Sequence, residues 1–137
     1  KPHTVPLSRQ AVVIFKEQKD VTGHWEHVFP SPVKPMQSMS NNAILSALKG
    51  MGFKGRMTGH GFRALAMSAI KEKLNYRHEV VDRQLAHAPK NKIDAAYDRA
   101  DFLDERKKMM QEWSDYIDSL AVNGEVIEGK FQGNIHA

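Results

Sequence analysis

The chain has 137 residues, a formal net charge of +4 and no cysteine. Its hydrophobic fraction of 41% is enough for the core of one compact domain and excludes an intrinsically disordered chain. The lack of cysteine excludes disulfides, thiolate catalysis and thiolate metal ligands, and no apolar run reaches the roughly 20 residues of a membrane span. The excess of Lys and Arg is compatible with a polyanionic partner such as DNA, but many ordinary domains are equally basic.

The first forty residues predict one helix between extended or irregular segments. Residues 3–7 predict a short extended segment, after which Ser8 can cap a helix that ends at residues 21–23. Residues 27–29 are a strand candidate, and three prolines predict a loop over residues 31–40. The apolar face of the expected helix consists of Ala11, Val12, Ile14 and Phe15.

Three further helices are predicted in the middle of the chain. The first begins near Asn41 and stops at Gly50, and the second begins after Thr58. The third runs from about residue 77 to residue 87, because Pro89 disfavours helical backbone at the residue before it. In the third helix, Val80, Val81 and Leu85 are expected to be buried. The apolar positions of the first two helices recur at helical spacing: Ile44, Leu45, Leu48, Phe62, Leu65, Ala66, Ala69 and Ile70.

Two more helices complete the prediction, a short one over residues 93–99 and the longest one from about residue 102 to residue 120. No periodicity follows Asn123. We therefore expect a mainly α fold with a small antiparallel sheet near the amino end (α+β). We expect one domain over residues 1–123 and a tail over residues 124–137. The face of the longest helix carries Phe102, Arg106, Met109, Met110, Trp113, Ile117 and Leu120.

Four residues suit chemistry on a phosphate group. His60 and Arg63 are three positions apart and share one helix face. A guanidinium donates two parallel hydrogen bonds to phosphate oxygens, and a histidine can donate another or move a proton. His87 follows a helix end, and Tyr97 lies ten residues later between small neighbours. A phenol is a weak nucleophile near neutral pH, and nearby cations would favour its reactive phenolate.

Each of these residues taken alone has a simpler interpretation. A lone His-x-x-Arg is more often a solvated helix face, His87 a helix-end cap, and Tyr97 a core or interface aromatic. Tyr76 and Tyr116 are competing nucleophiles in principle. These interpretations lose weight when the order and spacing of the whole set are considered.

The whole set resembles the tyrosine recombinase family, which includes the phage integrases. That family has His-x-x-Arg at the start of a helix, a Leu-Gly-His or similar motif about two dozen residues later, and a nucleophilic tyrosine about ten residues further on. Here the matching residues are His60 and Arg63, then the segment 85–87, then Tyr97. The sequences of residues 3–8, 58–64, 84–87 and 95–100 resemble the prophage and genomic-island integrase branch, in the carboxyl-terminal part of its catalytic domain.

The resemblance implies a site-specific recombinase that integrates and excises mobile DNA. Arg63 and His60 would hold the scissile phosphate, His87 would hydrogen-bond to it, and Tyr97 would attack phosphorus to form a 3′-phosphotyrosyl intermediate. No metal, cofactor or small-molecule substrate is implied. The partners would be double-stranded DNA at attachment sites and further copies of the protein, as a tetramer on DNA. The protein would be cytoplasmic in a bacterium, and its tail would be exchanged between subunits.

Departures from the family pattern define the alternative. The family has another catalytic Arg and a hairpin Lys upstream of the position of Val5, and Lys1 is too close to Val5 to match that Lys. Because the sequence also begins at Lys1 rather than Met, we expect a piece of a longer protein that is inactive alone. The runner-up is a non-catalytic DNA-binding or assembly module from a decayed integrase.

The remaining charged residues give weaker signals. A basic zone surrounds Tyr97, and within it Lys90 and Lys92 are expected near the DNA backbone. Its other members are expected to be mostly solvated helix surface: Arg99, Arg106, Lys107 and Lys108. His24 and His27 lack a third ligand at recognisable spacing, so no metal site is expected.

Overall fold

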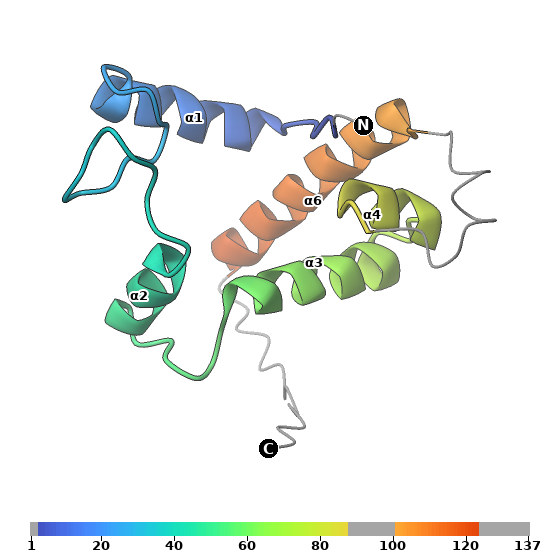
Figure 1. Cartoon of the computed structure of the whole chain (residues 1–137). Helices are drawn as coiled ribbons and strands as arrows, with labels where there is room; N and C mark the ends of the chain where they lie inside the picture. The colour runs from blue at the N-terminus through green and yellow to red at the C-terminus, as the bar shows by residue number, and fades with distance from the viewer. Residues whose placement is uncertain (1–2, 88–100, 124–137) are drawn as a thin grey trace.

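The computed structural model describes residues 3–87 and 101–123. The helices in these ranges are α1 (Arg9–Thr22), α2 (Ala43–Gly50), α3 (Gly59–Lys73), α4 (His78–Gln84) and α6 (Leu103–Asn123) (Figure 1). None of them is long and apolar enough to cross a membrane. The short helix expected over residues 93–99 and the expected tail lie outside the described residues.

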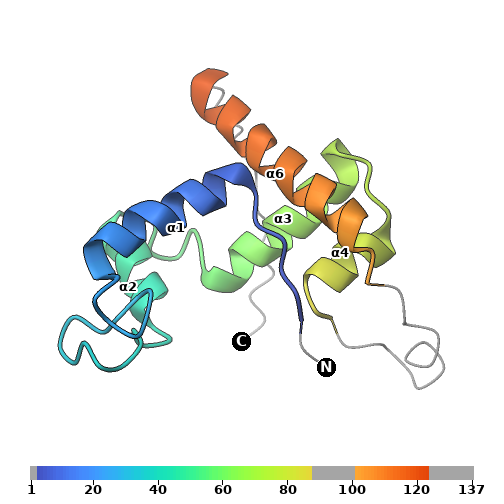
Figure 2. The same cartoon turned by 90° about the horizontal axis from the view of Figure 1, so that it is seen from above.

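Helices α3, α4 and α6 form the packed part of the molecule (Figure 2). Ile70 from α3, Val80 and Val81 from α4, and Met109 from α6 meet in one core cluster. Each of these four side chains is at most 3% exposed. Full burial of such a side chain contributes about 1.5–3 kcal/mol, so this contact holds the three helices together. Leu85, which the sequence places in the core, is partly buried at its edge.

Helix α1 begins and ends where the sequence predicts, but it does not bury its apolar face. The Ser8 hydroxyl accepts a hydrogen bond from the Ala11 amide at 3.2 Å and caps the helix. Polar contacts join its first turn to α6, among them the Ser114–Ser8 hydroxyl bond at 2.7 Å. Much of that face is exposed: Val12, Ile14 and Phe15 are 37%, 59% and 40% exposed.

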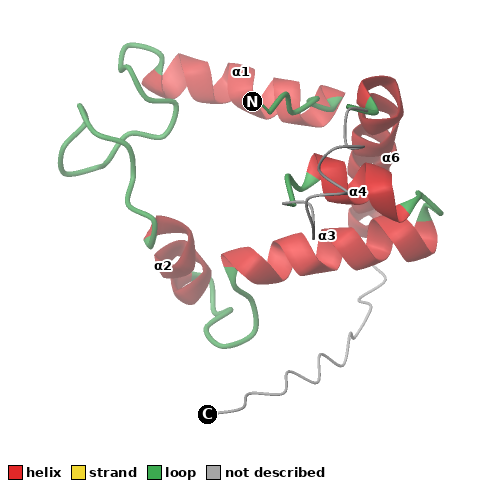
Figure 3. Ribbon diagram, turned by 45° about the vertical axis from the view of Figure 1, so that its right-hand side comes forward, coloured by secondary structure: helices red, strands yellow, loops and turns green. Residues whose placement is uncertain are grey.

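Helix α2 is likewise in place with an apolar face that is mostly exposed. Leu48 is buried, whereas Ile44 and Leu45 are 56% and 45% exposed. Figure 3 shows α2 beyond the amino end of α3, away from α4 and α6. Helical periodicity identifies an apolar face correctly, but it does not say whether another element lies against that face.

The small antiparallel sheet is not found among residues 3–87 and 101–123. Residues 3–7 and 27–29 form no strand, and the nearest feature is an isolated antiparallel bridge between Pro30 and Ser38. Two backbone hydrogen bonds flank that bridge: Ser31 N–H to Gln37 O at 2.8 Å and Met39 N–H to Phe29 O at 2.9 Å. Proline has no N–H to donate, so the prolines in this segment prevent the ladder from growing.

Candidate active site

The first turn of α3 carries His60 and Arg63. Thr58 ends the preceding loop in an extended conformation, and its hydroxyl accepts from the Gly61 amide at 3.0 Å. A Cβ on Gly61 would come within 2.9 Å of the Met57 sulfur, so a larger residue here would require that side chain to move. In this turn His60 is exposed and Arg63 is half-buried.

Arg63 connects this turn to the end of α4. Its Nη2 donates a hydrogen bond to the backbone carbonyl of Leu85, two residues before His87. The bond leaves the other guanidinium N–H groups available to an anion. The segments that hold His60, Arg63 and His87, which are far apart in the sequence, are thereby brought together at one end of the α3–α4 pair.

The backbone at the end of α4 places His87. Leu85 is the C-cap, Ala86 follows with φ of 51°, and the amides of Ala86 and His87 donate to the carbonyls of Arg83 and Asp82 at 3.2 and 3.1 Å. This pattern is a Schellman motif, in which the residue after the cap adopts a left-handed conformation and is usually glycine. The Leu-Gly-His motif of the family has glycine at that position, and here Ala86 adopts the strained conformation instead.

The His87 side chain is paired with a carboxylate. Its Nδ1 lies 3.0 Å from Oδ1 of Asp82, while Nε2 of His78 lies 2.9 Å from Oδ2 of the same residue. A histidine at this helix end is predictable from the sequence. The sequence does not predict its contact with Asp82, five residues earlier, because that contact depends on the left-handed conformation of Ala86.

Arg106 is a second residue whose role the sequence did not reveal. The basic zone to which it belongs predicts mostly solvated helix surface, yet Arg106 is 1% exposed. It donates to Oε1 of Gln84 at 2.9 Å, to the Asp101 carbonyl at 3.2 Å and to the Thr4 carbonyl at 2.6 Å. Burial is the main cause that lowers the pKa of its guanidinium. The sequence feature that could have predicted this burial is the position of Arg106 on the apolar face of the longest helix.

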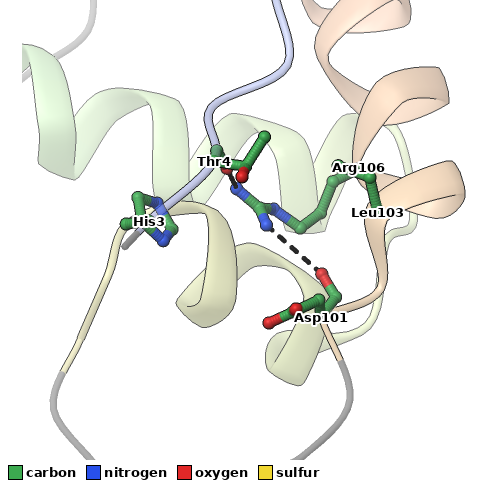
Figure 4. A pocket seen from close by; sticks show the side chains of 5 residues that line it. All are labelled: His3, Thr4, Asp101, Leu103 and Arg106. Atoms are coloured by element: carbon green, nitrogen blue, oxygen red, sulfur yellow. Dashed lines mark hydrogen bonds between the residues drawn. The ribbon is translucent and has the colours of Figure 1, made fainter. Parts of the chain in front are cut away.

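Around Arg106 lies a small pocket lined by His3, Thr4, Asp101, Leu103 and Arg106 (Figure 4). The guanidinium points across it toward the amino-terminal segment, and the dashed lines in the figure mark two of its bonds. Because Gln84 is also bound, Arg106 connects three segments: the amino-terminal stretch, the last turn of α4 and the start of α6. Its bond to Gln84 holds the last turn of α4, which precedes His87, against α6.

The structure gives information on two of the three tyrosines considered as nucleophiles. Tyr97 lies outside the described residues, as do Lys90 and Lys92. Tyr76 donates to Oε2 of Glu112 at 2.8 Å, and burial together with that carboxylate raises the pKa of its phenol to about 12. Tyr116 stacks on Trp113 with ring centroids 5.9 Å apart. A raised pKa makes the Tyr76 phenolate harder to form, which disfavours this residue as a nucleophile.

Comparison with known proteins relates the chain to integrases. It is 42% identical to prophage integrase IntZ and 38% identical to prophage integrase IntA, both of Escherichia coli strain K12, with 93% of the chain covered in each case. It is 41% identical to the integrase of Enterobacteria phage P4, with 85% of the chain covered. The chain belongs to the phage integrase family. No family model and no solved structure matches it.

The match spans 27–32% of the length of these three integrases. Nearly the whole chain therefore corresponds to a little under a third of each relative. The region that they share includes the described halves of the candidate site, at the start of α3 and the end of α4.

Proposed function

We propose that this integrase chain contributes the phosphate-binding histidines and arginine and the nucleophilic tyrosine of a site-specific DNA recombinase. The observation that carries the proposal is the bond from Arg63 to the Leu85 carbonyl, which joins the His60–Arg63 turn to the segment holding His87. The second support is the relationship to integrases from phages and prophages.

The start of α3 suits an anion for two reasons. The N-terminus of a helix carries partial positive charge and unpaired backbone N–H groups. Arg63 adds a guanidinium fork that matches two oxygens of one phosphate, and the exposed His60 can donate a further hydrogen bond. A phosphodiester held here would face donors from α3 and from His87 at the end of α4.

The reaction that fits these donors is transfer of a phosphoryl group to a phenol. The Tyr97 oxygen attacks phosphorus and loses its proton, the bond from phosphorus to the 5′ oxygen breaks, and that oxygen takes up a proton. The product is a 3′-phosphotyrosyl link and a free 5′-hydroxyl, and attack by the 5′-hydroxyl of a partner strand reverses the step. Donors arranged around the phosphate before reaction stabilise the charge that develops in the transition state.

The DNA partner would be held mainly through its backbone. Lys90 and Lys92 shortly precede the proposed nucleophile in the sequence and would contact phosphates near the cleaved bond. Strand exchange between two duplexes requires several copies of the protein, for which we propose a tetramer on attachment-site DNA. The non-catalytic alternative keeps DNA binding and assembly but forms no covalent link.

A nicked suicide substrate tests the proposal, because it traps the covalent intermediate. We expect the complete protein to form a protein–DNA adduct that Tyr97→Phe abolishes while DNA binding is retained, since only the attacking oxygen is removed. Tyr116→Phe is the matched control and should still form the adduct.

Two outcomes would contradict this assignment. Adduct formation by Tyr97→Phe would place the nucleophile elsewhere, at Tyr116 if that variant is inactive. The lack of any adduct with the unaltered complete protein, on DNA that it binds, would favour the non-catalytic alternative.

A further inference from the structure

Two bonds tie His87 to Asp82, one through the backbone and one through the side chains. The His87 amide donates to the Asp82 carbonyl at 3.1 Å, and the His87 Nδ1 lies 3.0 Å from the Asp82 carboxylate. In a Schellman motif these two positions often make an apolar contact. Here that contact is replaced by an acid and a base, which the geometry of the helix end alone does not require.

We infer that Asp82 is a positioning residue for the cleavage reaction, holding His87 so that Nε2 is presented to the DNA phosphate. The inference rests on the proposed function, because that function gives His87 its place at the phosphate. The hydrogen bond made by one ring nitrogen decides which nitrogen carries the proton in a neutral imidazole. With Nδ1–H donated to Asp82, Nε2 is the nitrogen left to face the substrate.

The contact with the carboxylate can be kept when His87 donates to a phosphate. A protonated ring donates from both nitrogens, so Nδ1–H can remain on Asp82 while Nε2–H binds a phosphate oxygen. A hydrogen bond between two charged groups is shorter and stronger than one between neutral groups. Asp82 is thus suited to fix the direction in which His87 donates.

The surroundings of Asp82 limit repulsion between its charge and a phosphate. His78 occupies Oδ2 at 2.9 Å while His87 occupies Oδ1, so both carboxylate oxygens are engaged within α4 and its cap. The neighbouring elements present basic groups here: Arg63 of α3 donates to the Leu85 carbonyl, and the His3 ring contacts the Gln84 carbonyl at 3.3 Å. The Asp82 side chain itself is 27% exposed.

A double-mutant cycle on adduct formation by the complete protein tests the inference. We expect Asp82→Ala to slow cleavage about tenfold, a part of the roughly hundredfold or more that a positioned proton donor contributes. In the His87→Ala background the same change should alter the rate by less than about twofold, because the residue through which Asp82 acts is gone. Glu79→Ala, exposed on the same helix, is the matched control and should leave the rate unchanged.

A spectroscopic measurement on the unaltered protein covers the case in which Asp82→Ala does not fold. With nitrogen-15-labelled histidine, the neutral His87 ring should carry its proton on Nδ1, its signal being assigned by its loss in His87→Gln. A proton on Nε2 would overturn the inference. An equal slowing by Asp82→Ala in both backgrounds would overturn it as well, while the proposed function would stand. Cleavage that survives both Tyr97→Phe and His87→Ala would instead overturn the proposed function.

Discussion

Ala86 shows how one residue sets the position of another. Its φ of 51° lies in the left-handed region, which costs a residue with a Cβ about 1–2 kcal/mol. That conformation turns the chain after α4 so that the His87 amide returns to the Asp82 carbonyl. The sequence predicts that a helix ends here, but only the backbone geometry explains why His87 faces its partner.

Replacing Ala86 with glycine should therefore stabilise the protein. We expect Ala86→Gly to raise the free energy of unfolding by about 0.5–1 kcal/mol. Glycine removes the backbone strain of the left-handed conformation, and this gain exceeds the free-energy cost of the extra conformational entropy that glycine loses on folding. Urea denaturation measures this change, and the slope of the unfolding free energy against urea concentration should stay unchanged. Ala64→Gly, at an exposed position inside α3, is the contrast and should lower stability by a similar amount. A loss of stability in Ala86→Gly would contradict the left-handed assignment.

Among the elements, α6 organises the others through Arg106. Met109 on the same helix supplies the apolar contact with α3 and α4, while Arg106 satisfies carbonyls of two irregular segments and the amide side chain of Gln84. A buried guanidinium with several acceptors is costly to disturb, since truncation leaves those acceptors without their donor.

Arg106→Met should lower the free energy of unfolding by about 2–4 kcal/mol, because it keeps the apolar stem but removes every donor. Lys107→Met, on the exposed face of the same turn, should change it by no more than about 0.5 kcal/mol. Thermal or urea denaturation of the two variants provides the comparison. Equal effects would mean that the Arg106 bonds contribute little in solution.

At the scale of the whole molecule, stability is concentrated in α3, α4 and α6. The buried cluster lies entirely in these helices, whereas α1 and α2 expose most of their apolar side chains. Helices of 14 and 8 residues gain little from hydrogen bonding alone in water and depend on packing. The two parts should therefore open with different free energies.

Hydrogen exchange measures this difference directly. We expect the amides of α2, and of α1 beyond its first turn, to exchange faster than those of α6 around Met109 by at least about a hundredfold, because local opening there exposes little new apolar surface. The measurement should use the complete protein without DNA. Equal protection of α2 and α6 would show that another part of the protein covers the exposed faces.

The sequence by itself determined where the described helices lie and the caps at Ser8 and Thr58, and it predicts the candidate set His60, Arg63, His87 and Tyr97. Caps and periodic apolar positions are local signals, and they were read correctly in α1, α3 and α4. The small sheet was not found in the described residues, because prolines interrupt the segment that was to form it. The roles assigned to these residues stay predictions: His60, Arg63, His87, Tyr97, Lys90 and Lys92.

The tertiary structure decided which apolar faces are covered and which polar residues are partners. Exposure of the α1 and α2 faces, burial of Arg106 and the pairing of Asp82 with His87 all depend on contacts between segments, or on one left-handed residue. The same holds for the bond that brings Arg63 to Leu85, 22 positions away. Such contacts arise from the packing of whole helices, and a pattern that repeats every three or four residues carries no information about them.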